Sequence, residues 1–267
     1  MKMICTPISY RKRIILSAIS MAILILGYSW MSHIQHSKNS TDTTIPNFAQ
    51  LVHGFHKIVT PNSSGDIPII RDAKATSFRF TLGMIIGSAV AIMVGMVIGC
   101  FESFAAMSRW ALILLSNAVP TAMMAIYFFL FGTGEELFVA IVALGIFSPI
   151  ALGIYDSIKK DVPDELIFTT YTLGASNFEA AYEAVFKQIF PRIILLIQAQ
   201  IGPALVYLIA VEWIMSDRGF GYHLRIQLRL LNMSQVYEYI LILAGAGFFL
   251  NWGFTTFRRK IAPWFGE

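Results

Sequence analysis

The sequence predicts an all-α polytopic membrane protein with six transmembrane helices. Of its 267 residues, 56% are hydrophobic and only 13% are charged, so most of the chain is unsuited to a surface in water. Six apolar runs without charged residues each approach the ~20 residues that a helix needs to cross the hydrocarbon core. Because these runs lack the period-two alternation of a membrane β-barrel, only helices can satisfy their backbone polar groups.

The six predicted spans are Ile14–Met31, Phe80–Phe101, Trp110–Gly134, Leu137–Tyr155, Ile193–Val211 and Tyr239–Phe257. Lys and Arg resist translocation, and most of them fall on the inner side when both termini are cytoplasmic. The sequence therefore predicts a multi-pass membrane protein with both termini cytoplasmic, in short segments at 1–13 and 258–267.

The first span, residues 14–31, resembles a signal peptide in its basic flank. Its 18 residues exceed a usual signal-peptide core, and no clean small-residue cleavage site follows. A retained membrane anchor is favoured over a cleaved signal peptide.

The segment 32–79 between the first two spans is polar and is expected to be periplasmic. It contains "IPNFAQLVHGFHKIV", in which apolar residues recur at helical spacing, so an amphipathic helix lying along the outer membrane surface is expected. His53 and His56 have the spacing of a metal pair, but no third ligand lies nearby in the sequence.

Residues 80–257 form a predicted core of five helices. The second span repeats a small residue every fourth position, at Gly83, Gly87, Ala91, Gly95 and Gly99, which lets helix backbones approach closely in lipid. This packing face suits either another helix of the same chain or a second subunit.

Prolines and polar side chains interrupt the later spans. Pro120, Pro149 and Pro203 each remove a backbone hydrogen bond and are expected to bend their helices around a lumen. Five residues are candidates for the translocation path: Asn117, Pro120, Gln198, Gln200 and Glu212. The amides suit interhelical hydrogen bonds equally well, and Glu212 is either a gating residue or a carboxylate at the membrane interface.

The predicted cytoplasmic loop, residues 157–191, is expected to form two short helices separated by a turn at Gly174. The second helix has an apolar face at helical spacing: Phe178, Tyr182, Val185, Phe186 and Ile189. Such a face predicts docking, either on the ends of the protein's own spans or on a soluble partner.

The run "DELIFTTYTLGASNFEAAYEAVFKQIFPRI" resembles the cytoplasmic loop of permease subunits of binding-protein-dependent ABC importers. Its "LGAS" is closest to the nitrate, sulfonate and taurine group. With Gly174 as the anchor, the family's Glu-Ala-Ala positions fall on Phe168, Thr169 and Thr170, so the literal triplet at 179–181 is not the motif. The segments "FFLFGTGEELFVAIVALGIFSPIALGIYDSI" and "AVEWIMSDRGFGYHL" extend the resemblance over residues 45–260, although Ala125 replaces a usual proline.

The resemblance implies a type I importer permease of the bacterial inner membrane whose loop forms coupling helices for a separate ATPase. The residues that it assigns to ATPase coupling are Phe168, Thr169, Thr170, Leu173, Gly174, Ala175, Ser176, Phe178, Tyr182 and Val185. It also implies three kinds of partner: a cytoplasmic ABC ATPase dimer that binds ATP and Mg²⁺, a second permease copy in a homodimer, and a periplasmic solute-binding protein.

Other classes of function find less support in the residues. The chain has no phosphate-binding loop of the type Gly-x-x-x-x-Gly-Lys-[Ser/Thr], no catalytic pair within a span, and no cofactor or metal motif among its two cysteines and five histidines. A net charge of +4 without a basic cluster excludes a nucleic-acid partner. An ion-gradient transporter or channel is the alternative, but the six runs lack the buried ionisable groups that it would need.

The solute is not determined by these patterns. Residues expected on the outer side, Arg218, Arg225 and Arg229, could attract a small anion, although a basic face lying on lipid headgroups is the commoner use of such residues.

Overall fold

The computed structural model describes residues 9–38, 44–61 and 67–263, in which every regular element is a helix. The elements are α1 (Tyr10–Lys38), α2 (Phe48–Val59), α3 (Pro68–Cys100), α4 (Glu102–Asn117), α5 (Met124–Phe131), α6 (Glu135–Asp161), α7 (Asp164–Thr172), α8 (Asn177–Ala180), the π-helix η1 (Ala181–Phe186), α9 (Lys187–Ala199), α10 (Ile201–Met215), α11 (Phe220–Arg229) and α12 (Met233–Ile261). The all-α prediction is confirmed. The outermost parts of the predicted terminal segments, 1–8 and 264–267, lie outside the described residues.

Five helical stretches in the described part of the chain are long and apolar enough to cross a membrane. They are Ile14–Ser37, Pro68–Cys100, Glu135–Asp161, Asn177–Met215 and Met233–Ile261. Five of the six predicted spans therefore correspond to continuous or nearly continuous helix. The second is longer than its apolar run because α3 begins at Pro68, so the segment predicted to be periplasmic includes the first three turns of a spanning helix.

The predicted third span, 110–134, is not one helix. The chain forms α4, leaves helical geometry at Ala118 (φ −69°, ψ 130°), and resumes helix only at Met124. Pro120 explains the break, because proline has no N–H to donate and disfavours helical geometry in the residue before it. The prediction of a single helix here is wrong, and the two pieces are too short to be counted separately as spans.

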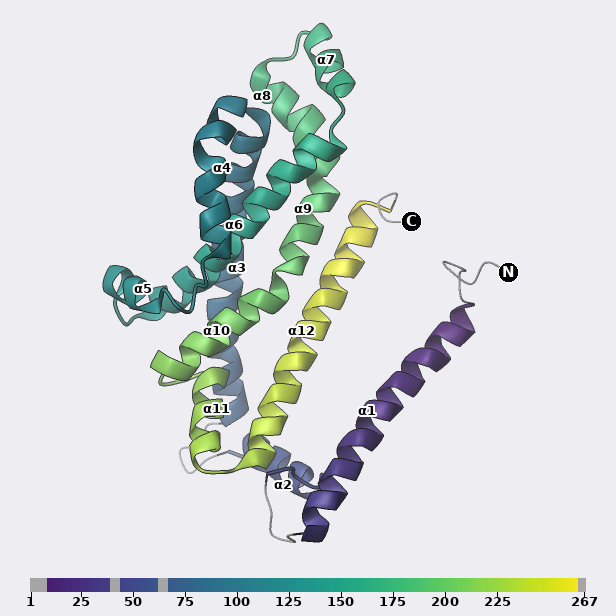
Figure 1. The fold of residues 1–267 in the computed structure, drawn as a ribbon, viewed down its shortest axis with the longest axis vertical. Coiled ribbons are helices and arrows are strands. Elements are labelled where there is room, and N and C mark those ends of the chain that lie inside the picture. The colour runs from purple at the N-terminus through teal and green to yellow at the C-terminus, as the bar shows by residue number, and fades with distance from the viewer. Residues whose placement is uncertain (1–8, 39–43, 62–66, 264–267) are drawn as a thin grey trace.

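The helices run mostly along one long axis (Figure 1). The loop formed by α7 and α8 makes one end of the molecule, and α2 and α11 make the other. Helix α1 meets the rest of the chain near α2 and diverges from α12. At that meeting point the Tyr28 hydroxyl donates to the Pro46 carbonyl at 2.8 Å, and the Tyr28 ring contacts Tyr237 edge-on.

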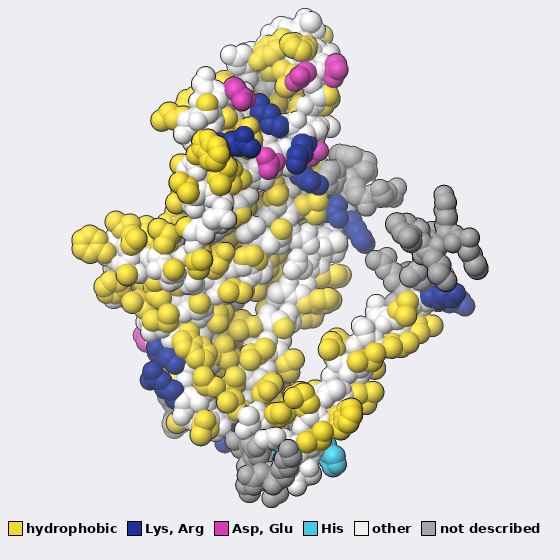
Figure 2. Space-filling model, viewed as in Figure 1, with side chains coloured by type: hydrophobic (Ala, Val, Ile, Leu, Met, Phe, Trp, Pro, Cys, Tyr) yellow, Lys and Arg dark blue, Asp and Glu magenta, His cyan; other side chains and the backbone are white. Residues whose placement is uncertain are grey.

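Apolar and charged side chains lie at different levels along the same axis. Figure 2 shows apolar side chains over the middle of the molecule, with Lys and Arg gathered at two levels on either side of this band. Helix α5 projects within the band, between the two charged levels. This is the distribution expected of a chain that crosses a bilayer.

The core is centred on the crossing of α3 and α6. Ile141, Ile146, Ile150 and Ile154 of α6 are fully buried, and the small residues of α3 face them. A Cβ atom on Gly87 would lie 2.7 Å from the Ala143 carbonyl oxygen, and one on Gly95 would lie 2.9 Å from the Cβ of Ile154. The small-residue stripe thus packs against a helix of its own chain.

The predicted fifth span, 193–211, is divided between α9 and α10. Helix α9 ends at Ala199, and Pro203 lies in the first turn of α10. Proline is tolerated in a first turn because its missing N–H has no partner there. Pro203 therefore does not bend a helix interior as expected, whereas Pro149 does lie inside α6.

A glycine-to-alanine pair tests the α3–α6 crossing. We expect Gly87→Ala to lower the free energy of unfolding by about 1–3 kcal/mol, since an added methyl group overpacks a filled contact. The matched control is Gly245→Ala in α12, where nothing lies within 4 Å of the new methyl group. Thermal unfolding of the detergent-solubilised variants measures the difference, and equal melting temperatures would contradict the close approach of the two helices.

Candidate functional site

The turn at Gly174 separates α7 from α8, as predicted. Gly174 has a φ of +85°, a left-handed conformation that glycine adopts at little cost. Its N–H donates to the Tyr171 carbonyl at 3.0 Å, and the Ala175 N–H donates to the Thr170 carbonyl at 3.1 Å. These two bonds form a Schellman motif, which ends α7 and fixes the direction of the following chain.

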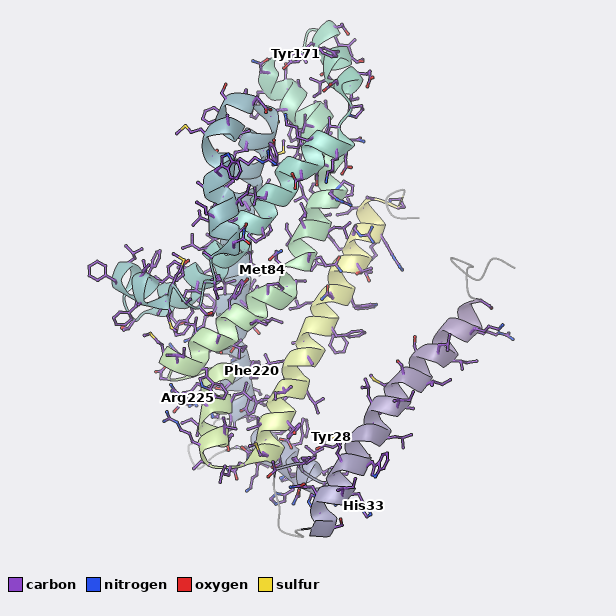
Figure 3. All side chains as sticks on the ribbon, in the orientation of Figure 1. Tyr28, His33, Met84, Tyr171, Phe220 and Arg225 are labelled. Atoms are coloured by element: carbon purple, nitrogen blue, oxygen red, sulfur yellow. The ribbon has the colours of Figure 1, made fainter. Side chains whose placement is uncertain are left out.

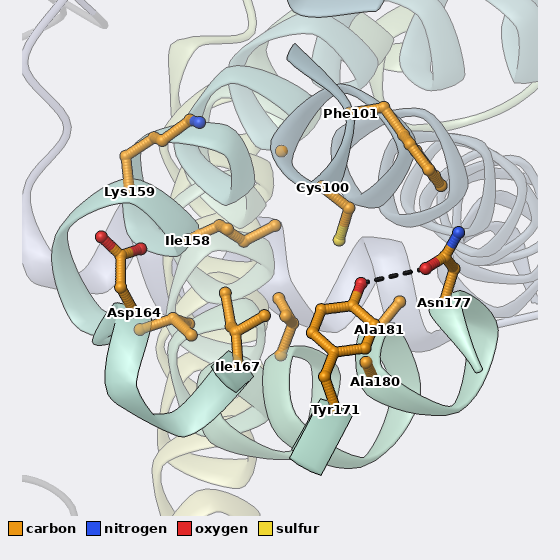
Figure 4. A pocket seen from close by; sticks show the side chains of 13 residues that line it. Cys100, Phe101, Ile158, Lys159, Asp164, Ile167, Tyr171, Asn177, Ala180 and Ala181 are labelled. Atoms are coloured by element: carbon orange, nitrogen blue, oxygen red, sulfur yellow. Dashed lines mark hydrogen bonds between the residues drawn. The ribbon is translucent and has the colours of Figure 1, made fainter. Parts of the chain in front are cut away.

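The start of α8 is fixed by a capping box that was not predicted from the sequence. The Glu179 N–H donates to the Ser176 hydroxyl at 3.3 Å, while the Ser176 N–H donates to the Glu179 carboxylate at 2.8 Å. The pattern Ser-x-x-Glu is a sequence-level signal for this motif. The Tyr171 hydroxyl also donates to the Asn177 side-chain oxygen at 3.1 Å, which joins α7 to α8 (Figure 4).

Four apolar side chains project from this end of the molecule, and we call them the apolar crown: Phe168, Tyr171, Leu173 and Phe178. They are between 44% and 82% exposed. Figure 3 places Tyr171 at the tip, far from the α2 end. A cluster of large apolar groups exposed on a polar loop is typical of a protein-binding surface.

The other predicted coupling residues do not all share this surface. Val185 is only 4% exposed and packs in the core of the chain, so at this position the predicted face docks on the ends of the chain's own spans, the first of the two alternatives, and is not open to a soluble partner. The reason is the π-helix η1, whose wider turns rotate Val185 away from Phe178. Tyr182 is half exposed and stacks on Phe186 with ring centroids 5.7 Å apart.

The remaining positions lie close to the crown. Thr169 is exposed and Thr170 is half-buried. Both hydroxyls donate to carbonyls of their own helix, those of Glu165 and Ile167, at 2.7 Å. The positions that match the family's Glu-Ala-Ala motif therefore present no charge and no free donor.

A cavity of about 170 Å³ lies beneath the loop, between α7, α8, η1 and the adjoining ends of α3 and α6 (Figure 4). Val185, Ile158 and Val162 contribute apolar wall, while Cys100, Lys159 and Asp164 contribute polar atoms. Val185 and Val162 also belong to the main core. The loop is thus seated on α3 and α6 and is expected to move with them.

A buried ion network lies toward the opposite end of α3. The Arg79 guanidinium is 1% exposed, and the Glu212 carboxylate is 0% exposed, with an N–O distance of 3.0 Å. Glu212 also accepts from the Thr76 hydroxyl at 3.0 Å and from the Gly221 N–H at 3.1 Å. Its expected position at an accessible span end is therefore wrong, because each carboxylate oxygen is enclosed and hydrogen-bonded.

Arg79 also contacts α6 and the loop after α10. It donates to both carboxylate oxygens of Glu135, at 2.5 and 2.9 Å, and to the Ser216 hydroxyl at 3.0 Å. Arg218 donates to the same Glu135 carboxylate at 2.9 Å. One guanidinium thereby joins α3, α6, α10 and the 216–219 segment.

A second buried carboxylate, Asp72, continues this network toward α12. It accepts from the Gly219 N–H at 3.2 Å and from the Tyr239 hydroxyl at 3.1 Å, and it lies 2.6 Å from Nδ1 of His223. Gly219 has a φ of +108°, and an added Cβ would collide with Glu212. This network was not predicted from the sequence, because its contacts between helices join residues far apart in the chain, from 56 positions for Arg79 and Glu135 to 167 for Asp72 and Tyr239, that share no motif.

The remaining predicted path residues lie at two separate helix breaks. Asn117 is exposed at the end of α4, where its side-chain amide donates to the Ile113 carbonyl at 2.8 Å. Pro120 is buried in the following break. Gln198 and Gln200 flank the break between α9 and α10, and Gln198 donates to Thr255 of α12 at 2.9 Å. Gln198 thus forms the interhelical hydrogen bonds that were the alternative to path lining.

Two of the three arginines expected to attract an anion already have partners. Arg218 binds Glu135, and Arg225 donates to the carbonyls of Ile214 and Ser216, at 2.8 and 3.0 Å. Arg225 therefore caps the end of α10, and Figure 3 shows it on α11 near that end. Arg229 is exposed. Across the described residues no group of three or more His, Cys, Asp or Glu is placed to hold a metal ion.

Comparison with known proteins gives consistent matches over most of the chain. The profile of the family described as "binding-protein-dependent transport system inner membrane component" matches residues 87–264. The taurine transport system permease protein of Escherichia coli is 24% identical over 84% of this chain and 81% of its own length. A protein of Methanocaldococcus jannaschii named as an ABC transporter permease is 27% identical over 80% and 78%. One of Bacillus subtilis named as an aliphatic sulfonates transport permease is 22% identical over 83% and 78%.

The buried network predicts that replacing Arg79 lowers the free energy of unfolding strongly. We expect Arg79→Met to lower the free energy of unfolding by about 3–5 kcal/mol, because Glu212 is left buried without a cation. Arg218→Met should cost only about 0–1 kcal/mol, since Arg218 is half exposed. Thermal unfolding of the purified variants measures both changes.

The double variant Arg79→Met/Glu212→Met is the control for this interpretation. It should recover part of the loss, because Glu135 is partly exposed and keeps Arg218 as its partner. A double variant less stable than Arg79→Met alone would show that the ion pair is not the source of the effect.

Proposed function

Because this chain belongs to the family of binding-protein-dependent transport system inner membrane components, we propose that it is the permease subunit of an ATP-driven importer. In this proposal the chain forms a path for a small anionic solute that a periplasmic binding protein delivers. A separate ATPase dimer, which binds ATP and Mg²⁺, contacts residues 157–191 from the cytoplasm. Both termini then lie on the cytoplasmic side of the inner membrane.

The apolar crown is the observation that carries the proposed coupling. Its large side chains meet water in the isolated chain, and burying them against a partner would be favourable. Since Phe168 replaces the acidic residue usual at its position, the contact would rest on apolar packing rather than on an ion pair. The Gly174 turn and the capping box make the loop a short, stiff lever suited to rigid-body movement.

The break between α4 and α5 supports a path on the adjoining face. Non-helical backbone at membrane depth is tolerated only where protein covers it or where it lines a water-filled cavity. Residues 118–123 and the exposed Asn117 occupy such a break, next to a projecting α5 that lies within the apolar band. A second copy of the chain on this face would enclose the path and form the proposed homodimer.

The names of the relatives support the class of solute. Taurine and aliphatic sulfonates, which those names print, are small molecules with a sulfonate group. We extend that class to this chain as a small organic anion. The protein lacks a phosphate-binding loop in its sequence, so the energy for transport would come from the partner ATPase and the chain itself would not be an enzyme.

Reconstitution into vesicles with the proposed partner ATPase and binding protein, isolated from the same organism, tests this function. We expect solute uptake to require ATP inside the proposed cytoplasmic compartment, with no dependence on an ion gradient. Leu173→Asp should weaken binding to the ATPase at least tenfold, because it would bury an unpaired charge. Thr133→Asp, exposed in the turn before α6 and outside residues 157–191, is the control and should leave ATPase binding unchanged. Uptake driven by an ion gradient without ATP would overturn the proposal.

Variants of Gly174 test whether the conformation of the turn between α7 and α8 is needed for coupling. Gly174→Val should uncouple ATP hydrolysis from uptake, because a β-branched residue is strained at a φ of +85°. Gly174→Asn should keep most of the coupling, since asparagine tolerates the left-handed region. The ratio of ATP hydrolysed to solute imported measures the effect, and equal ratios in both variants would show that the turn conformation does not matter.

A further inference from the structure

Helix α2 has an apolar arc that the described protein only half covers. At about 100° per residue, the polar side chains of Gln50, His53, His56 and Lys57 fall on one side of the helix. The opposite side divides into two adjacent stripes. The first contains Leu51, Gly54 and Ile58, and the second contains Phe48, Val52, Phe55 and Val59.

The first stripe is packed against the protein. Ile58 is 3% exposed and shares a small core with Phe220 and Tyr239. Gly54 lies directly on α12, where an added Cβ would stand only 3.0 Å from the carboxyl carbon of Glu238. Glycine therefore lets the α2 backbone lie directly against the Glu238 carboxylate, which a larger residue would displace.

The second stripe is uncovered. Its four side chains are between 42% and 68% exposed. They recur at i, i+4, i+7 and i+11, so they form one continuous band along the helix. An exposed apolar band that runs the length of a short helix indicates a surface that is covered by another protein or by lipid.

The bilayer is the occupant that the surroundings favour. Helix α2 lies at the ends of α1 and α12, both of which are long and apolar enough to cross a membrane (Figure 1). Their outward side chains near this end, such as Trp30 and Leu241, are more than 60% exposed. Tyr28 and His33, labelled in Figure 3, mark where α1 reaches α2. The exposed band of α2 thus continues a surface that meets lipid.

The charge of α2 agrees with a lipid surface. The helix contains no acidic residue, and its polar side carries Lys57 and two histidines. A helix with an apolar arc and a basic polar face settles at the boundary between acyl chains and phosphate headgroups.

We propose that α2 is an interfacial membrane helix whose apolar arc is shared between α12 and the acyl chains of the bilayer. Membrane contact then has a structural consequence within the protein. Glu238 is 5% exposed and forms no ion pair among the described residues, and α2 covers its carboxylate. Hydration of the Glu238 carboxylate would favour separation of α2 from α12. Burial of Phe48, Val52 and Phe55 in lipid would oppose that separation, because it keeps α2 at the membrane surface.

Site-specific fluorescence in the full-length chain tests this placement. With Cys5 and Cys100 replaced by serine, Val52→Cys and His53→Cys are each labelled with the fluorophore NBD and reconstituted in nanodiscs of phosphatidylcholine and phosphatidylglycerol. The label at 52 should be quenched several-fold more by nitroxide on the acyl chains than the label at 53. Aqueous iodide should show the reverse order, since position 52 lies in the exposed apolar band whereas position 53 lies about 100° away, on the polar side of the helix.

Two outcomes would overturn the proposal. Equal iodide quenching at 52 and 53 would place the exposed band in water. Absence of acyl-chain quenching at 52 together with photo-crosslinking from that position to a second copy or to the binding protein would show that protein covers it. Phe55→Cys repeats the measurement if Val52→Cys fails to insert, and lipid quenching there supports the proposal.

Discussion

Arg79 places a single guanidinium, almost completely buried, between two carboxylates that belong to different helices. Its bonds to Glu135 and Glu212 hold the start of α6 and the end of α10 against α3. Buried charges of this kind are tolerable only while they stay paired, because the loss of Arg79 would leave Glu212 buried without a cation. The outer network through Thr76, Asp72 and Gly219 is arranged around this constraint.

The same two helices, α3 and α6, connect this network to the Gly174 loop. Their crossing is close because glycines on α3 admit the backbone and isoleucines of α6. The loop is seated on their far ends through Val162 and Val185. Since tightly packed interfaces shift between discrete arrangements rather than deforming gradually, a displacement of the loop would be carried along this pair. In the proposed importer, ATPase movements at the apolar crown would reach the ion network by that route.

Helix breaks mark the places where the chain departs from a simple bundle. The residues near Pro120 and the junction at Gln200 both interrupt apolar stretches. Each proline removes a donor, but their effects differ with position: Pro120 ends a helix, Pro203 begins one, and Pro149 lies inside one. Hydropathy alone cannot separate these cases, because the surrounding residues are equally apolar.

The sequence by itself determined the all-α membrane class, five of the spans, the small-residue stripe and the turn at Gly174. These features are local: about 20 consecutive apolar residues define a span, and one glycine in a short loop defines a turn. The capping box at Ser176 and Glu179 was equally local and could have been predicted. Only the tertiary structure decided that Val185 turns inward, that Glu212 is sealed beside Arg79, and that α2 keeps half of its apolar arc uncovered. These outcomes depend on which helix faces meet across long separations in the chain, and a π-helical turn or a pairing between residues 79 and 212 leaves no periodic trace in the sequence.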